Sequence, residues 1–240
     1  IMNIMRETNN LFKPELLAPA GDPEKLLFAY LYGADAAYIG AGDYSLRLNA
    51  GFSLEQIGDA IHLAHRLGKK LYLAVNSFMR EGDLEALPEY LSQLAALEPD
   101  AMIISDPAVL TLARQYAPQV PLHISTQANT TNWLSARFWR EQGASRIILA
   151  RELSLAEAGK ISIQAGVETE IFIHGAMCIS YSGRCLLSSF MTGRSANQGN
   201  CSHPCRYHYA LMEEKRPGEY FPVEEDQRGT YVFNSKDLCM

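Results

Sequence analysis

The chain has 240 residues, 48% of them hydrophobic, and a formal net charge of −6 at pH 7. This length allows one large core of the size found in α/β barrels. No apolar run reaches the roughly 18–20 residues of a membrane span, and residues 1–6 lack the basic-then-apolar pattern of a signal peptide. We therefore expect a cytoplasmic protein without membrane partners, and the acidic balance gives no general sign of nucleic-acid binding.

Seven short apolar runs alternate with amphipathic stretches over the first 174 residues. Each run is continuous rather than alternating, which is typical of strands covered on both faces. The runs are 15–20, 36–40, 70–76, 101–106, 121–126, 146–151 and 170–174. The expected helices are 23–31, 54–67, 83–97, 107–116, 132–142 and 154–161. Asp22 and Ser53 precede the first two helices as N-caps.

Regular strand–helix–strand units predict a parallel sheet. Seven strands before residue 175 favour a barrel over a doubly wound sheet, and no Gly-x-Gly-x-x-Gly follows the first strand. We predict an α/β fold, a TIM-type (β/α) barrel over 13–174, complete or left open. A cysteine-rich insertion follows strand seven at 175–212, and an exposed hairpin or loop follows at 213–229.

The last segment, 230–240, is expected to hold a final strand and the start of a truncated helix. The strand at 230–235 is either the eighth barrel strand or part of an excursion from the seventh. We expect the chain to be a fragment of a longer protein or an open barrel.

Polar residues stand where the predicted strands end, and the carboxyl ends of barrel strands carry the chemistry of this fold. Asn76, Asp106, Gln127, Asn129, Arg151, Glu152 and His174 occupy these ends. We expect all of them except Asn76 to converge on one pocket. His174, Arg151 and Glu152 are the predicted catalytic residues, and the other four are predicted to bind substrate.

Several of these residues also have a purely structural interpretation. Asp106 precedes Pro107 and is a natural N-cap, and Asn129 is close enough to cap the helix from 132. Arg151 and Glu152 can form an ion pair at the rim.

The sequence predicts different roles for two histidines. His123 lies inside a strand and is expected to be a core residue. His174 stands at a strand end, four residues before Cys178, and could hydrogen-bond a cluster sulfur or a substrate carboxylate.

Four cysteines lie within 28 residues with the spacing C-x6-C-x15-C-x3-C: Cys178, Cys185, Cys201 and Cys205. Gathered thiolates favour Zn²⁺ or an iron–sulfur cluster, and two disulfides are the alternative. A reducing compartment supports ligation over cross-linking. The cysteines follow strand seven, so they emerge on the working face, where the metal could take part in chemistry or only clasp a loop.

Residues 174–212 contain no Asp or Glu but carry three arginines and several aromatic residues. Such a surface can hold phosphates and stack a base. Tyr181, Arg184 and Arg206 are the residues predicted to do so. Alternatively, the positive charge serves the thiolates and the aromatic side chains only pack.

Other catalytic signatures are missing from the sequence. It has no Gly-x-Ser-x-Gly and no His-Glu-x-x-His. The spacing of Cys178 and His174 allows them to form a nucleophilic pair. Ligation of a metal or cluster, however, explains all four clustered thiols together.

Several motifs resemble the peptidase U32 family. They are ELLAPAG at 15–21, YGADAAY at 32–38, STQAN at 125–129, RELS at 151–154, HGAMC at 174–178, YSGRC at 181–185 and NSKDL at 234–238. The likeness runs from about residue 13 to the end. It is greatest to the branch, formerly described as collagenase-like proteases, that supports 5-hydroxyuridine formation at the tRNA wobble position. Sister branches act in rRNA cytidine and ubiquinone hydroxylation.

This resemblance implies a [4Fe-4S] cluster on the four cysteines, with Zn as the alternative from the residues alone. It implies prephenate as the hydroxyl donor, hence a small carboxylate co-substrate, and tRNA and a homologous partner subunit as partners. Cys239 lies outside the four-cysteine pattern, although some sister proteins use a later cysteine as a ligand. Family members continue past 234–237 with a helix, a strand and a C-terminal domain.

Three functions are thus open. The first hypothesis is cluster-dependent hydroxylation of a tRNA uridine. The second is a metal- or thiol-dependent peptidase acting on collagen-like chains. The third is a non-catalytic scaffold in which the metal only stabilises a loop.

Overall fold

The computed structural model describes residues 13–46, 51–212, 214–215, 217–218, 220–222 and 237–239. Its main sheet has seven parallel strands in the order β1-β2-β4-β5-β6-β7-β8. They are β1 (Leu17–Pro19), β2 (Ala36–Ala41), β4 (Lys70–Val75), β5 (Ala101–Ile104), β6 (Leu122–Ile124), β7 (Arg146–Ile148) and β8 (Glu168–Glu170). A short strand β3 (Gly51–Phe52), which the sequence did not predict, pairs with β2. The prediction of parallel neighbouring strands is confirmed.

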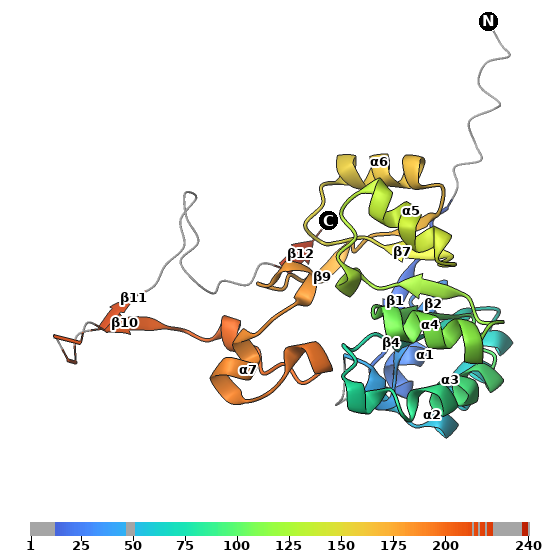
Figure 1. The fold of residues 1–240 in the computed structure, drawn as a ribbon, viewed down its shortest axis with the longest axis horizontal. Coiled ribbons are helices and arrows are strands. Elements are labelled where there is room, and N and C mark those ends of the chain that lie inside the picture. The colour runs from blue at the N-terminus through green and yellow to red at the C-terminus, as the bar shows by residue number, and fades with distance from the viewer. Residues whose placement is uncertain are drawn as a thin grey trace, which may run out of the picture.

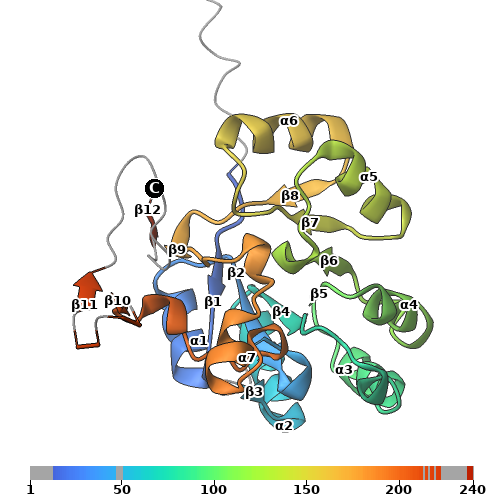
Figure 2. The same ribbon diagram turned by 60° about the vertical axis from the view of Figure 1, so that its left-hand side comes forward.

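Six helices surround the outside of the curled sheet (Figure 1; Figure 2). They are α1 (Pro23–Leu31), α2 (Leu54–Arg66), α3 (Leu87–Ala96), α4 (Pro107–Tyr116), α5 (Trp133–Glu141) and α6 (Leu155–Ala165). Local caps fix the starts of α1, α2, α5 and α6, because the side chains of Asp22, Ser53, Asn132 and Ser154 each accept a hydrogen bond from a first-turn N–H. Helix α3 begins four residues later than predicted, and α6 runs four residues further.

The sheet is a curled half-barrel in which no strand pairing joins β8 to β1 within the described chain. At the amino end of the strands, side chains connect these two edges instead. Arg146 of β7 donates to Glu15 Oε1 at 2.7 Å and to Glu168 Oε1 at 2.9 Å. Lys70 Nζ lies 2.8 Å from Glu15 Oε2, and Tyr72 Oη lies 2.7 Å from Glu15 Oε1. We call these residues, with Glu170, the amino-end cluster.

Burial and charge shift the pKa values in this cluster. Burial alone would raise the pKa of Glu15, but hydrogen bonds from Arg146, Lys70 and Tyr72 outweigh it and hold the pKa at about 2. Burial raises the pKa of Glu170 to about 7 against the opposing charge of Arg146. Burial, and then Arg146, lower the pKa of neighbouring His123 to about 3. His123 packs edge-on against Tyr72, as expected of a core residue.

The seventh barrel strand lies earlier than the sequence indicated. The predicted run was 170–174, but β8 ends at Glu170, and His174 belongs to β9 (His174–Ala176), outside the parallel sheet. The reason is that Glu168 and Glu170 bind Arg146, so the real strand has no apolar signature.

The insertion contains the 3-10 turn η5 (Tyr181–Gly183), helix α7 (Leu187–Thr192), and the turns η6 (Ala196–Gln198) and η7 (Pro204–Arg206). Strand β10 (Ala210–Met212) then pairs antiparallel with β11 (Tyr220–Pro222), consistent with the expected hairpin.

At the end of the chain, β12 (Asp237–Cys239) pairs antiparallel with β9. These residues form a strand where the start of a helix was predicted, because they continue the backbone pairing of β9. The strand predicted at 230–235 lies outside the described residues. No helix in the part of the chain described above is long and apolar enough to cross a membrane.

Candidate functional site at the carboxyl end of the sheet

The insertion is anchored to the carboxyl ends of β6 and β7 through Ser182. The backbone N–H of Ser182 donates to Glu152 Oε1 at 2.6 Å. Its hydroxyl lies 3.0 Å from Glu152 Oε2 and 2.9 Å from Asn129 Oδ1. Ser182 takes a left-handed backbone conformation with φ of 45°, which a serine adopts at a cost that these contacts offset. Two predicted site residues, Asn129 and Glu152, therefore position the insertion.

A second set of contacts fixes the same loop. Arg184 Nε donates to the carbonyl of Gln127 at 3.3 Å, and its guanidinium lies 5.6 Å from the centre of the Phe78 ring. Gly183 packs so closely that a Cβ there would lie 2.7 Å from Gln127 Oε1. The predicted RNA-binding residue Arg184 thus also anchors the insertion to the sheet.

The far part of the insertion rests on the loops after β2 and β4. The N–H of Phe78 donates to the carbonyl of Asn197 at 3.1 Å. Gly199, at φ of 82°, lies so close to the backbone that a Cβ would meet the Ser45 carbonyl oxygen at 2.6 Å. The insertion therefore lies across the carboxyl ends of the strands, and Figure 2 shows α7 in front of them.

The four cysteines of this insertion are free, with Cys185 buried and the other three half-buried. Burial raises the pKa of Cys178, and the thiols of Cys185 and Cys201 add to the effect. Burial likewise raises the pKa of Cys205, with contributions from the other three thiols. The four sulfurs are thus close enough to influence one another, and the disulfide alternative is not what the structure shows.

Hydrogen-bond donors surround two of the sulfurs. Burial opposes ionisation of Cys185, but the Ser180 hydroxyl and the N–H groups of Ser188 and Leu187 outweigh it and lower the pKa of this thiol. The N–H of His203 donates to Cys201 Sγ at 3.4 Å. Such donors stabilise thiolates and tune bound iron–sulfur clusters.

Four cysteines with these donors are the residue set that a [4Fe-4S] cluster requires. Among residues with described side chains, no group of three or more His, Cys, Asp or Glu could hold a single metal ion. A four-iron cube spreads its ligand sulfurs over roughly 4–7 Å, more widely than one tetrahedral ion does. Four cysteine thiols in one insertion are a donor set of the kind that binds such a cluster.

Arg151 lies beside these thiols at the end of β7. Its guanidinium carbon is 4.4 Å from the centre of the Phe172 ring. Burial lowers the pKa of Arg151, while the nearby Cys178, Tyr38 and Glu152 oppose that effect. No ion pair joins Arg151 to Glu152, both of which are described, so the predicted structural pair is not formed. The arrangement is a half-buried cation close to Cys178 and Glu152.

Two other predicted residues, Asp106 and Asn76, have structural partners away from the cysteines. Asp106 caps α4 through Ala108 N at 2.8 Å and also accepts from Met79 N at 3.2 Å, so its structural interpretation is the one observed. Asn76 accepts from Leu46 N and donates to Ser125 Oγ. His174, Tyr181 and Arg206 are exposed.

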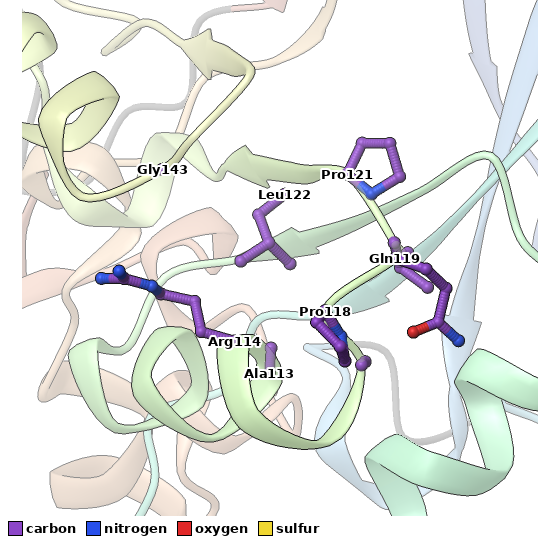
Figure 3. Close-up of a pocket in the computed structure, with 9 residues that line it drawn as sticks. Ala113, Arg114, Pro118, Gln119, Pro121, Leu122 and Gly143 are labelled. Atoms are coloured by element: carbon purple, nitrogen blue, oxygen red, sulfur yellow. The ribbon is translucent and has the colours of Figure 1, made fainter.

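Two cavities stand apart from the predicted pocket. One of about 350 Å³ lies at the amino end of β6, beside Arg114 and Gln119 (Figure 3). The other, of about 220 Å³, lies between the loops after β2 and β4 and Gln198 of the insertion. None of the six residues expected to share a pocket lines either cavity. Sequence reasoning missed Ser182, whose only signal is its place before Gly183 in the YSGRC segment.

Comparison with known proteins decides the family. The profile of Peptidase family U32 matches residues 21–240. The chain belongs to this family. It is 40% identical to tRNA hydroxylation protein P of Escherichia coli K12 over 95% of the chain and 59% of that protein. It is 45% identical to tRNA hydroxylation protein P of Helicobacter pylori 26695 over 93% of the chain and 54% of that protein.

The chain therefore spans somewhat more than half the length of these U32 relatives. A solved structure, that of the U32 peptidase Mk0906, is similar in fold with a TM-score of 0.61. It is 18% identical in sequence, and the match covers 80% of this chain and 76% of that one. This likeness supports the half-barrel architecture.

Proposed function

We propose that this U32 chain is the catalytic part of an enzyme that hydroxylates a tRNA uridine, giving 5-hydroxyuridine at the wobble position. The observation that carries the proposal is the likeness to proteins named for tRNA hydroxylation, which extends over more than nine tenths of the chain. The enzyme would act in the cytoplasm, where thiols stay reduced.

We propose that Cys178, Cys185, Cys201 and Cys205 hold a [4Fe-4S] cluster. Such a cluster supplies one-electron transfer or Lewis-acid chemistry when bound. The chain's own contribution is the set of hydrogen-bond donors at Cys185 and Cys201 and the anchoring of the insertion over the strand ends.

Arg151 is proposed to bind the carboxylate of a small hydroxyl donor such as prephenate. A guanidinium presents a planar fork that matches a carboxylate with two parallel hydrogen bonds. Here burial and Phe172 hold the fork beside Cys178 without an acidic partner in the described chain. The donor would therefore lie between the arginine and the cysteines.

Gln127, Asn129 and Glu152 are proposed as positioning residues, because their contacts are with the insertion. His174 is exposed on β9, and no hydrogen bond joins it to Cys178 within the described residues. The absence of this hydrogen bond favours ligation by Cys178 over a nucleophilic pair with His174.

The proposal is tested with the full-length natural protein, purified without oxygen, and with tRNA from cells lacking its gene. We expect the purified protein to be brown and to contain iron. We expect 5-hydroxyuridine to be missing from tRNA of cells that lack the gene and to return when the gene is restored. Replacement of any of the four cysteines by serine should abolish both the absorbance and the modification, while Cys239→Ser should spare both. The proposal would be wrong if the purified protein were colourless and contained zinc, and if deletion of its gene left tRNA unchanged. The scaffold alternative would then be favoured.

A further inference from the structure

The insertion exposes several large apolar side chains. Phe190 is 85% exposed and Leu186 is 78% exposed. They are four residues apart at α7, so they share one face of the helix. Tyr181, Met191 and Tyr207 are also about half exposed. Exposed apolar groups gathered on a small module mark a binding surface.

This surface has the opposite charge balance from the rest of the molecule. Residues 174–212 carry arginine and histidine without Asp or Glu, whereas the whole chain has a net charge of −6. Arg194 and His203 are exposed on the same module. A polyanion would be repelled by the acidic body and attracted to the insertion. A second copy docking by the same patch would bring arginines together, which is unfavourable.

Helix α7 is also held by side-chain hydrogen bonds. The hydroxyl of Ser202 lies 2.9 Å from that of Ser188 and 2.7 Å from that of Thr192, and the N–H of Ser202 donates to Ser188 Oγ. These bonds tie α7 to the segment that follows Cys201. A rigid aromatic platform binds at a lower entropic cost than a mobile one.

We infer that the exposed face of α7 binds an unpaired RNA loop, with Phe190 stacking on a base and Arg194 contacting a phosphate. The inference rests on the proposed function and adds the location of the surface that binds the RNA. Every base has a face on which an aromatic ring can stack, and arginine neutralises the backbone. Since α7 lies between Cys185 and Cys201, RNA bound there would lie on the module that carries the cysteines.

The test uses the full-length natural protein and a fluorescent anticodon stem-loop RNA, with a blunt duplex of the same stem for comparison. Phe190→Ala is matched with Tyr32→Ala, because Tyr32 is an aromatic residue with the same 85% exposure that follows α1, outside the insertion. Arg194→Gln is matched with Arg66→Gln, an exposed arginine at the end of α2. Thermal stability, iron content and apparent mass are measured for each variant.

We expect Phe190→Ala to weaken binding of the stem-loop by about 5- to 100-fold, the range for loss of one stacked base, and to affect the duplex far less. Arg194→Gln should reduce the slope of log affinity against log salt by about 0.7, the value for one single-strand phosphate contact. Both control variants should bind as the wild type does.

Equal effects of Phe190→Ala and Tyr32→Ala would overturn the inference, as would a wild-type protein that does not bind the stem-loop. A Phe190→Ala protein with changed apparent mass or lowered thermal stability would also overturn it, because the surface would then contact protein. Uridine hydroxylation is scored separately. Its absence alongside binding that depends on Phe190 would refute the proposed function and leave the RNA surface standing.

Discussion

Two arginines of this chain stack on aromatic rings in different surroundings. Arg151 lies 4.4 Å from the centre of the Phe172 ring, beside Cys178, and burial lowers its pKa. Arg137 lies 4.5 Å from the centre of the Trp133 ring, on helix α5 outside the sheet. Comparison of the two arginines therefore separates the effect of stacking on carboxylate binding from the effect of a position beside the cysteines.

Arg151→Lys should weaken binding of prephenate about tenfold or more, because a lysine keeps the charge but loses one of two charge-assisted hydrogen bonds. Calorimetric titration of the full-length protein measures the affinity. Arg137→Lys removes a similar stacked guanidinium and should leave the affinity unchanged. Equal affinities of wild type and Arg151→Lys would remove Arg151 from the carboxylate site.

At the scale of elements, the insertion depends on a close approach of two backbones. Gly199 and Gly193 both have positive φ, of 82° and 69°. A Cβ at Gly199 would meet backbone of the loop after β2 at 2.6 Å, whereas a Cβ at Gly193 would meet nothing within 4 Å. The two glycines thus share the left-handed conformation, but only Gly199 lies against the backbone of another loop.

Gly199→Ala should detach this end of the insertion from the barrel, while Gly193→Ala should cost only the roughly 1–2 kcal/mol of left-handed strain. Hydrogen exchange of the amide of Phe78, which donates to Asn197, measures the detachment. We expect that amide to exchange faster in Gly199→Ala than in Gly193→Ala. The same exchange rate in both would mean that the contact does not hold the insertion.

The elements differ in how far the sequence could predict them. The helices were predicted well because their caps, such as Asp22 and Ser53, are local signals. Strand β8 was misplaced because its polar residues bind Arg146, which lies on another strand. For the site, strand ends indicated Asn129 and Glu152 as pocket residues, whereas the structure shows them in contact with Ser182, 53 and 30 residues away in the chain. No local pattern encodes such a contact.

At the scale of the whole molecule, the half-barrel is closed at its amino end by charge rather than by a strand. Glu15, before β1, and Glu168 and Glu170, on β8, all contact Arg146. Arg146 is buried, and a buried cation left without partners is strongly destabilising. The protonation of these carboxyl groups therefore bears on the stability of the entire sheet.

Glu170→Gln should change how stability depends on pH. Burial raises the folded-state pKa of Glu170 to about 7 from the ordinary 4.5. A raised carboxyl pKa contributes stability below the unfolded-state value, and this contribution is lost as pH rises through about 7. Glutamine mimics the protonated acid at every pH. Between pH 5 and pH 8 the free energy of unfolding of the variant should therefore rise relative to that of the wild type, by about 3 kcal/mol at most.

Urea unfolding across this pH range measures the difference. Glu168→Gln is the control, because it removes another carboxylate contact of Arg146 from the same strand, but one whose side chain is 56% exposed. The expected result is a pH-dependent gain in Glu170→Gln that exceeds any in Glu168→Gln. Parallel curves for Glu170→Gln and the wild type would mean that Glu170 is ionised in the folded protein throughout. Arg146 would then be neutralised by all three carboxylates, and the amino-end closure would be insensitive to pH near neutrality.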